Sequence, residues 1–131
     1  MSGEFKHPTV EAVLAIHDEV LVAHGGSSGL GDRGLLESAV AAPQASMMGE
    51  PLIKDPIEIA SAYLFYICSN HAFVDGNKRT ALATCLVCLS ENGLLQNEEL
   101  NTDEWESLTL AVAAGELSRD DLTKRLRKLV D

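Results

Sequence analysis

Two long apolar segments are joined by the polar stretch His71-Ala72-Phe73-Val74-Asp75-Gly76-Asn77-Lys78-Arg79. The segments on either side, residues 55–70 and 77–92, carry apolar side chains on more than one helical face. Such a pattern is typical of helices that are surrounded by protein rather than by water. We therefore expect two central helices connected by residues 71–79, which we call the motif loop.

Capping and breaking residues predict six helices in all. Asp55-Pro56 and Asn77 begin the central pair, and Asn92-Gly93 ends its second member. The other four are expected between Pro8-Thr9 and Gly25-Gly26, between Asp32 and Pro43, between Thr102, as the N-cap, and Gly115, and after a capping box at Ser118. Strand signals are nearly absent, Gln44–Lys54 is interpreted as a connector, and residues 25–31, with four glycines, as a flexible loop. The predicted fold is all-α, a compact single domain over residues 1–131.

Length and composition are those of a soluble globular protein. The chain has 131 residues, of which 46% are hydrophobic and 23% charged, enough for one domain with a real core. No apolar run approaches the roughly eighteen residues that a membrane span needs. Residues 1–8 lack the apolar stretch of a secretory signal, so a cytoplasmic location is expected.

The net charge of −10 argues against direct nucleic-acid binding as the main activity, because the chain repels a polyanion. A basic group near the C-terminus is interpreted as a helix end that complements its dipole; it consists of Lys124, Arg125, Arg127 and Lys128.

Several residues with chemical potential have a structural interpretation. Cys85 and Cys88 lack the second ligand pair of a zinc ribbon, so we expect them, with Cys68, to be core thiols. His17 is seven residues from His24, but no carboxylate cluster is near, and we expect it to support the core or the motif. Trp105, the single tryptophan, is expected to be a packing anchor.

The motif loop combines the residue types that phosphoryl or nucleotidyl transfer requires. His71 could take the proton from an attacking hydroxyl. Asp75 offers a hard oxygen ligand of the kind that Mg²⁺ uses beside nucleotide phosphates. Phe73, between them, is expected to anchor the loop in the core. The alternative is an ordinary connector in which His71 and Asp75 cap helices.

The residues after Asp75 predict an anion site. Gly76 permits close backbone approach, and with Asn77 it opens a helix whose first amides are free. Lys78 adds a point charge for one phosphate, and Arg79 adds a planar fork for two oxygens. These residues are therefore candidates for binding a nucleotide.

The spacing His71-x-Phe73-x-Asp75-Gly76-Asn77-Lys78-Arg79 resembles the signature of the Fic/Doc superfamily. Similarity to its death-on-curing (Doc) branch extends to His17-Asp18, Gly25-Gly26, residues 32–39 and residues 77–82. The resemblance implies a compact six-helix Fido fold, Mg-ATP as donor and a protein hydroxyl as acceptor. It gives His71 the role of catalytic base, Asp75 that of metal ligand, and the four following residues that of nucleotide binding.

Two departures from the signature bear on the kind of transfer. AMP-transferring relatives have a glycine where this chain has Lys78, and an arginine where it has Leu82. In Doc toxins a lysine at this place goes with a reversed nucleotide, whose gamma-phosphate meets the acceptor. Lys78 thus favours a kinase. Gly76 matches the AMP-transferring pattern instead, so AMP transfer is the alternative.

The resemblance also implies partners. The acceptor would be a threonine of translation elongation factor Tu, with translation arrested as the result. A cognate antitoxin would place a C-terminal helix in an apolar groove, and inhibition would come from that partner, because no inhibitory Ser/Thr-x-x-x-Glu-Gly pattern is found here. Two other hypotheses are a catalytically silent module that binds an antitoxin, and a ribonuclease toxin using His71, Lys78 and Arg79.

Overall fold

The computed structural model describes residues 4–95 and 101–130, so the first three residues of the stretch considered for a secretory signal lie outside it. The described part contains six α-helices, which confirms the predicted all-α fold. They are α1 (Val10–His24), α2 (Arg33–Ala41), α3 (Pro56–Asn70), α4 (Asn77–Glu91), α5 (Thr102–Ala113) and α6 (Arg119–Val130). Within these ranges, no helix combines the length and the hydropathy that crossing a bilayer requires.

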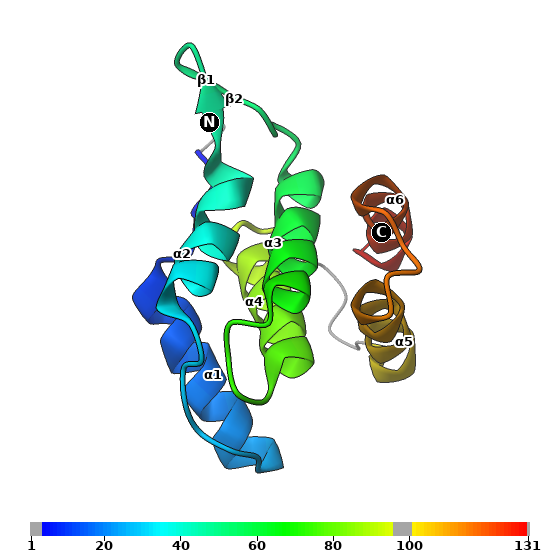
Figure 1. Cartoon of the computed structure of the whole chain (residues 1–131). Coiled ribbons are helices and arrows are strands. Elements are labelled where there is room, and N and C mark those ends of the chain that lie inside the picture. Colours follow the sequence, from blue (N-terminus) through cyan, green and yellow to red (C-terminus); the bar gives the residue numbers. More distant parts are fainter. Residues whose placement is uncertain (1–3, 96–100, 131) are drawn as a thin grey trace.

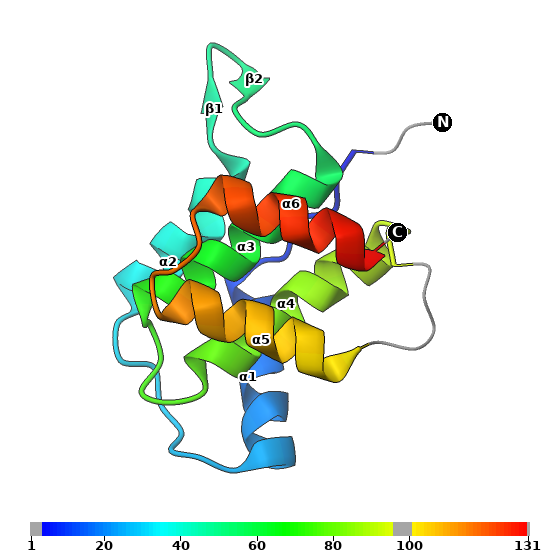
Figure 2. The ribbon, with the colours of Figure 1, turned by 90° about the vertical axis from the view of Figure 1, so that its right-hand side faces the viewer.

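The central pair predicted from the sequence is α3 and α4. Figure 1 shows them in the middle of the molecule, with α1 and α2 on one side and α5 and α6 on the other. Turned by a quarter, Figure 2 shows α5 and α6 lying across the front of this pair. Helix α3 contacts α2, α4, α5 and α6. The motif loop joins α3 to α4 at the lower end of Figure 1, together with the C-terminal end of α1.

Side-chain caps explain where the helices begin. Thr9 accepts a hydrogen bond from the Ala12 amide, and the side chains of Asp32, Asp55 and Ser118 cap α2, α3 and α6 as expected. The prediction for α5 was wrong by one position. Its N-cap is Asn101, whose side chain accepts from the Glu104 amide, and Thr102 is the first helical residue.

The connector before α3 contains a small hairpin that the sequence did not indicate. A single 3₁₀ turn (Ala42–Gln44) is followed by β1 (Ser46–Met47), paired antiparallel with β2 (Glu50–Pro51). The two residues between the strands, Met48 and Gly49, both have positive φ, at 53° and 81°, as in a two-residue hairpin turn. Strands of two residues are too short for an alternating pattern. The hairpin projects at the end of the molecule opposite the motif loop (Figure 1).

The core is built around α3 and α4, and the predicted packing anchor lies inside it. Trp105 is buried, and so are the three inward residues of α6, namely Leu122, Leu126 and Val130. All three cysteines are free and buried, which confirms that they are core thiols. Burial and the nearby Glu91 carboxylate raise the pKa of Cys88 to about 12, so this thiol remains protonated and unreactive near neutral pH.

Candidate active site

His71 is the first residue after α3, and its backbone conformation is the reason why the helix ends there. Its φ and ψ are 51° and 49°, in the left-handed region that non-glycine residues seldom adopt. The residue is exposed. Left-handed backbone at a histidine costs roughly 1 kcal/mol, and such strain is concentrated at functional sites. His71 is thus a candidate base that is open to a substrate.

His17 and Phe73 fix the motif loop to the core. Their rings are stacked, with centroids 3.8 Å apart and planes inclined by 10°. The His17 Nε2 atom lies 2.7 Å from the carbonyl oxygen of Asp75, and since a carbonyl only accepts, Nε2 carries the hydrogen. Both rings are buried. The predicted anchoring role of Phe73 and the motif-supporting role of His17 are confirmed.

Asn77 closes the motif loop with both ends of its side-chain amide. Its Oδ1 accepts from the Phe73 N–H at 3.0 Å, and its Nδ2 donates to the Phe73 carbonyl at 2.9 Å. The pair of bonds mimics a short strand ladder. The two bonds use one N–H and one lone pair of the side-chain amide, so its second N–H and the backbone N–H remain for contact with a nucleotide.

Asp75 presents an exposed carboxylate that is held by backbone amides. Ser27 N–H donates to Oδ2 at 3.2 Å, and Gly76 N–H donates to Oδ1 at 2.8 Å. First the Ser27 bond and then the Gly76 bond lower the pKa of Asp75, so the carboxylate is ionised at neutral pH. Among residues 4–95 and 101–130, no three His, Cys, Asp or Glu side chains form a metal cluster. A single carboxylate is enough to bind Mg²⁺, because water molecules and phosphate oxygens usually supply most of the other ligands of this ion.

Helix α4 begins without a side-chain cap. Its N-cap is Gly76, at φ 81°, and no side chain of residues 4–95 and 101–130 accepts from the amides of the first turn. Lys78 and Arg79 are exposed, and neither belongs to an ion pair in the described part of the chain. Cations at a helix N-terminus are opposed by the helix dipole. Together, the free amides and the two cations form a site that an anion would stabilise.

The glycine loop, as we call residues 25–31, is attached to the motif loop, contrary to the expectation of a flexible connection. Gly31 and Asp32 N–H groups donate to the Ala72 carbonyl at 2.8 and 3.0 Å, and Val74 N–H donates to the Gly29 carbonyl at 3.1 Å. Leu30 and Phe73 form an antiparallel bridge. The density of glycines signals this close backbone approach, but does not identify the segment approached.

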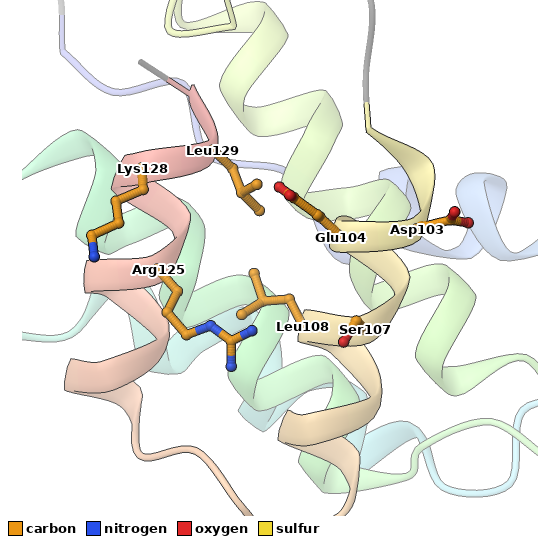
Figure 3. A pocket seen from close by; sticks show the side chains of 7 residues that line it. All are labelled: Asp103, Glu104, Ser107, Leu108, Arg125, Lys128 and Leu129. Atoms are coloured by element: carbon orange, nitrogen blue, oxygen red, sulfur yellow. The ribbon is translucent and has the colours of Figure 1, made fainter.

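A cavity of about 430 Å³ lies between α5 and α6, away from the motif loop. Figure 3 shows Arg125 and Lys128 on α6 and Glu104 on α5 on opposite sides of it. Arg127 pairs with Asp55, and Arg127 and Lys128 lie in the last turn of α6. Two of the four members of the C-terminal basic group, Arg127 and Lys128, therefore complement the helix dipole as predicted, whereas Lys124 and Arg125 lie before the last turn.

Comparisons of the sequence with known proteins identify relatives of this chain. A family model described as "Fic/DOC family" matches residues 7–89. The chain is 34% identical to "Protein kinase doc" of Escherichia phage P1 over 124 residues, which is 95% of either chain. It is 37% identical to "Toxin Doc" of Mycolicibacterium smegmatis over 105 residues, 80% of this chain and 81% of the relative. It is thus related to Doc toxins over most of its length.

Proposed function

Because the chain belongs to the Fic/Doc family, in its Doc branch, we propose that it transfers a phosphoryl group from Mg-ATP to a serine or threonine hydroxyl of a protein. The observation that carries this proposal is the start of α4, which has no side-chain cap. The exposed cations Lys78 and Arg79 lie in its first turn, beside the free amides. The phage P1 relative, named a protein kinase, supports the same activity.

The residues of the motif loop divide the reaction between them. His71 takes the proton of the acceptor hydroxyl, whose oxygen forms a bond to the gamma-phosphorus of ATP. The bond from this phosphorus to the beta-gamma bridging oxygen breaks, and ADP leaves. Lys78, Arg79 and the amides that follow Gly76 neutralise charge on the phosphates, which is the main contribution that a protein makes to this chemistry.

Asp75 is the residue that would hold magnesium. Its carboxylate is exposed and ionised, and in the described part of the chain it accepts from two N–H groups, so lone pairs remain on both oxygens. Magnesium bound here supplies positive charge that neutralises the phosphates.

For the biological role, we propose a toxin of a toxin-antitoxin pair. The acceptor is a threonine of translation elongation factor Tu, and its modification arrests translation in the cytoplasm. The antitoxin inhibits by placing a C-terminal helix in a groove of this chain. Support comes from the two relatives, one named a Doc toxin and the other a Doc kinase.

AMP transfer is the second candidate, favoured by Gly76. This residue matches the AMP-transferring signature, and its left-handed φ of 81° suits glycine. In that reaction the acceptor oxygen attacks the alpha-phosphorus and pyrophosphate leaves. The Lys78→Gly variant distinguishes the two nucleotide orientations, because it restores the signature glycine and should move the product toward the AMP adduct.

The direct test is to incubate the purified chain with Mg-ATP and elongation factor Tu and to measure the mass of the factor. A gain of about 80 Da identifies phosphorylation, whereas about 329 Da identifies AMP transfer. His71→Ala and added EDTA are the controls, and each should abolish the gain. Blocked translation without a mass shift, persisting in EDTA, would overturn the proposal in favour of a metal-independent ribonuclease. If the chain binds an antitoxin but transfers nothing to any protein, the result would favour the hypothesis of a catalytically silent module.

A further inference from the structure

The orientation of the Asp75 carboxylate depends on a segment far away in sequence. The Gly76 bond to Oδ1 is local, since the two residues are neighbours. The Ser27 bond to Oδ2 joins residues 48 positions apart. One bond to each oxygen restrains the rotation of an exposed side chain that would otherwise sample several rotamers. Both bonds are made within the chain itself and need no ligand.

Gly26 makes the long-range bond possible because it has no side chain. A Cβ atom at Gly26 would lie 2.7 Å from Asp75 Oδ2 and 3.2 Å from Leu21 Cδ2. The first distance is shorter than real contacts of Cβ atoms, so either the carboxylate or the loop would have to move. Gly26 also has φ +122°, which disfavours any other residue. The neighbouring Gly25 differs, since a Cβ there would meet nothing within 4 Å.

The glycine loop provides a fixed point for this bond. Its other end is tied to the motif loop through the bonds of Gly29, Gly31 and Asp32, at 2.8 to 3.1 Å. His17 holds the main chain of Asp75 from the opposite, buried side through the carbonyl oxygen. The main chain and the side chain of Asp75 are therefore held separately, by α1 and by the glycine loop.

We propose that Gly26 and the Ser27 N–H form a positioning clamp for Asp75, which pre-orients the carboxylate for the magnesium ion that accompanies the nucleotide. The identity of this ligand rests on the proposed function, whereas the clamp itself does not. A carboxylate that is already ordered loses less conformational entropy when the ion binds. Gly26 and Ser27 are thus positioning residues that act through Asp75.

The first test compares Gly26→Ala with the matched control Gly25→Ala. Both variants add one methyl group at adjacent glycines of positive φ, but only one directs it at Asp75. ATP affinity is measured by calorimetry in Mg²⁺ and in EDTA. We expect the gain in affinity from Mg²⁺ to fall about tenfold in Gly26→Ala, as for other supports of metal ligands, and to stay unchanged in Gly25→Ala. An equal gain in both variants would overturn the clamp.

The second test needs no nucleotide and does not depend on the folding of Gly26→Ala. Amide exchange at Ser27 is followed by NMR in the unaltered chain and in Asp75→Ala, whose exposed side chain contributes little to the core. We expect exchange about tenfold faster in Asp75→Ala, corresponding to one lost charge-assisted hydrogen bond. Equal rates would show that no clamp exists. A protected Ser27 amide in a chain that binds no ATP would instead refute the proposed function and the assignment of magnesium to the clamp.

Discussion

Helices α3 and α4 are equal in length and adjacent in the core, but their N-termini are built in opposite ways. At α3, the Asp55 side chain accepts from the Ile57 amide, proline is the first helical residue, and Arg127 pairs with the cap. At α4, Gly76 provides no side chain, and Lys78 and Arg79 follow. Helix α3 therefore begins with a side-chain cap, a proline and an acidic first turn, whereas α4 begins without a side-chain cap and with two cations.

This difference separates a structural helix start from a functional one. Burial acts to raise the pKa of Asp55, but the hydrogen bonds from Arg127 and Ile57 lower it overall, so the capping carboxylate is ionised. Its hydrogen-bond partners are residues of the same chain. The amides and cations of α4 have no such internal partner among the described residues. Helix α3 has 15 residues, so the two kinds of site, at its start and beyond its end, lie roughly 20 Å apart.

We expect the strongest effect on the rate of transfer, from a change in the motif loop. His71→Ala should lower the rate of transfer by about 10²–10⁴-fold, because the proton acceptor is lost. ATP affinity and melting temperature should change little, since the side chain is exposed. Transfer is measured by mass spectrometry and unfolding by circular dichroism. A variant that keeps full turnover would show that another group is the base.

Adding a cap to α4 would make its start resemble that of α3. Asparagine tolerates positive φ and can accept from first-turn amides, and a Cβ at Gly76 would make only ordinary contacts with His17, at 3.5 Å. Gly76→Asn should therefore weaken ATP binding several-fold without lowering the melting temperature. Gly93→Asn, at the opposite end of α4 and also at positive φ, is the control. Equal affinities in both variants would remove the role of the free amides.

Removing the cap of α3 should lower the stability of the fold and leave the activity unchanged, the reverse of the result expected for Gly76→Asn. Asp55→Ala is expected to lower the free energy of unfolding by about 1 kcal/mol, with the rate of transfer unchanged because the site is distant. Chemical denaturation provides the free energy. Arg127→Ala keeps the cap and removes the partly exposed ion pair, so its loss should be smaller. A lower rate of transfer in Asp55→Ala would contradict the separation.

A weaker effect is expected for the pH dependence of stability, through His7 beside α3. His7 Nδ1 lies 2.7 Å from the Tyr63 hydroxyl of α3, and burial lowers the pKa of His7 from its ordinary value of 6.5. As the pH falls, His7 therefore takes up a proton at a higher pH in the unfolded chain than in the folded one. The contribution of neutral His7 to the free energy of unfolding is fully present above pH 6.5 and is lost as the pH falls through the pKa of the folded state. His7→Gln should reduce the decline of stability in this range. His24→Gln, at an exposed position, should follow the unaltered chain.

The helices were predictable because their signals are local. Thr9, Asp32 and Asp55 cap through amides two or three residues away, so the pattern lies within one turn. The error at Thr102 arose where two adjacent residues could both serve as cap. The polar run 71–79 likewise identified the site as a candidate from residue types alone, although its catalytic and binding roles remain predictions.

Periodicity, caps and side-chain types act within a few residues, and they were enough to specify the all-α fold, the central helix pair and the chemistry available in the motif loop. The contacts that hold that loop in place depend on how distant segments pack together. The stacking of His17 on Phe73 and the Ser27 bond to Asp75 join distant segments. Backbone amides make several of these contacts, and since every residue except proline has one, no pattern of side chains reveals which amide meets which partner.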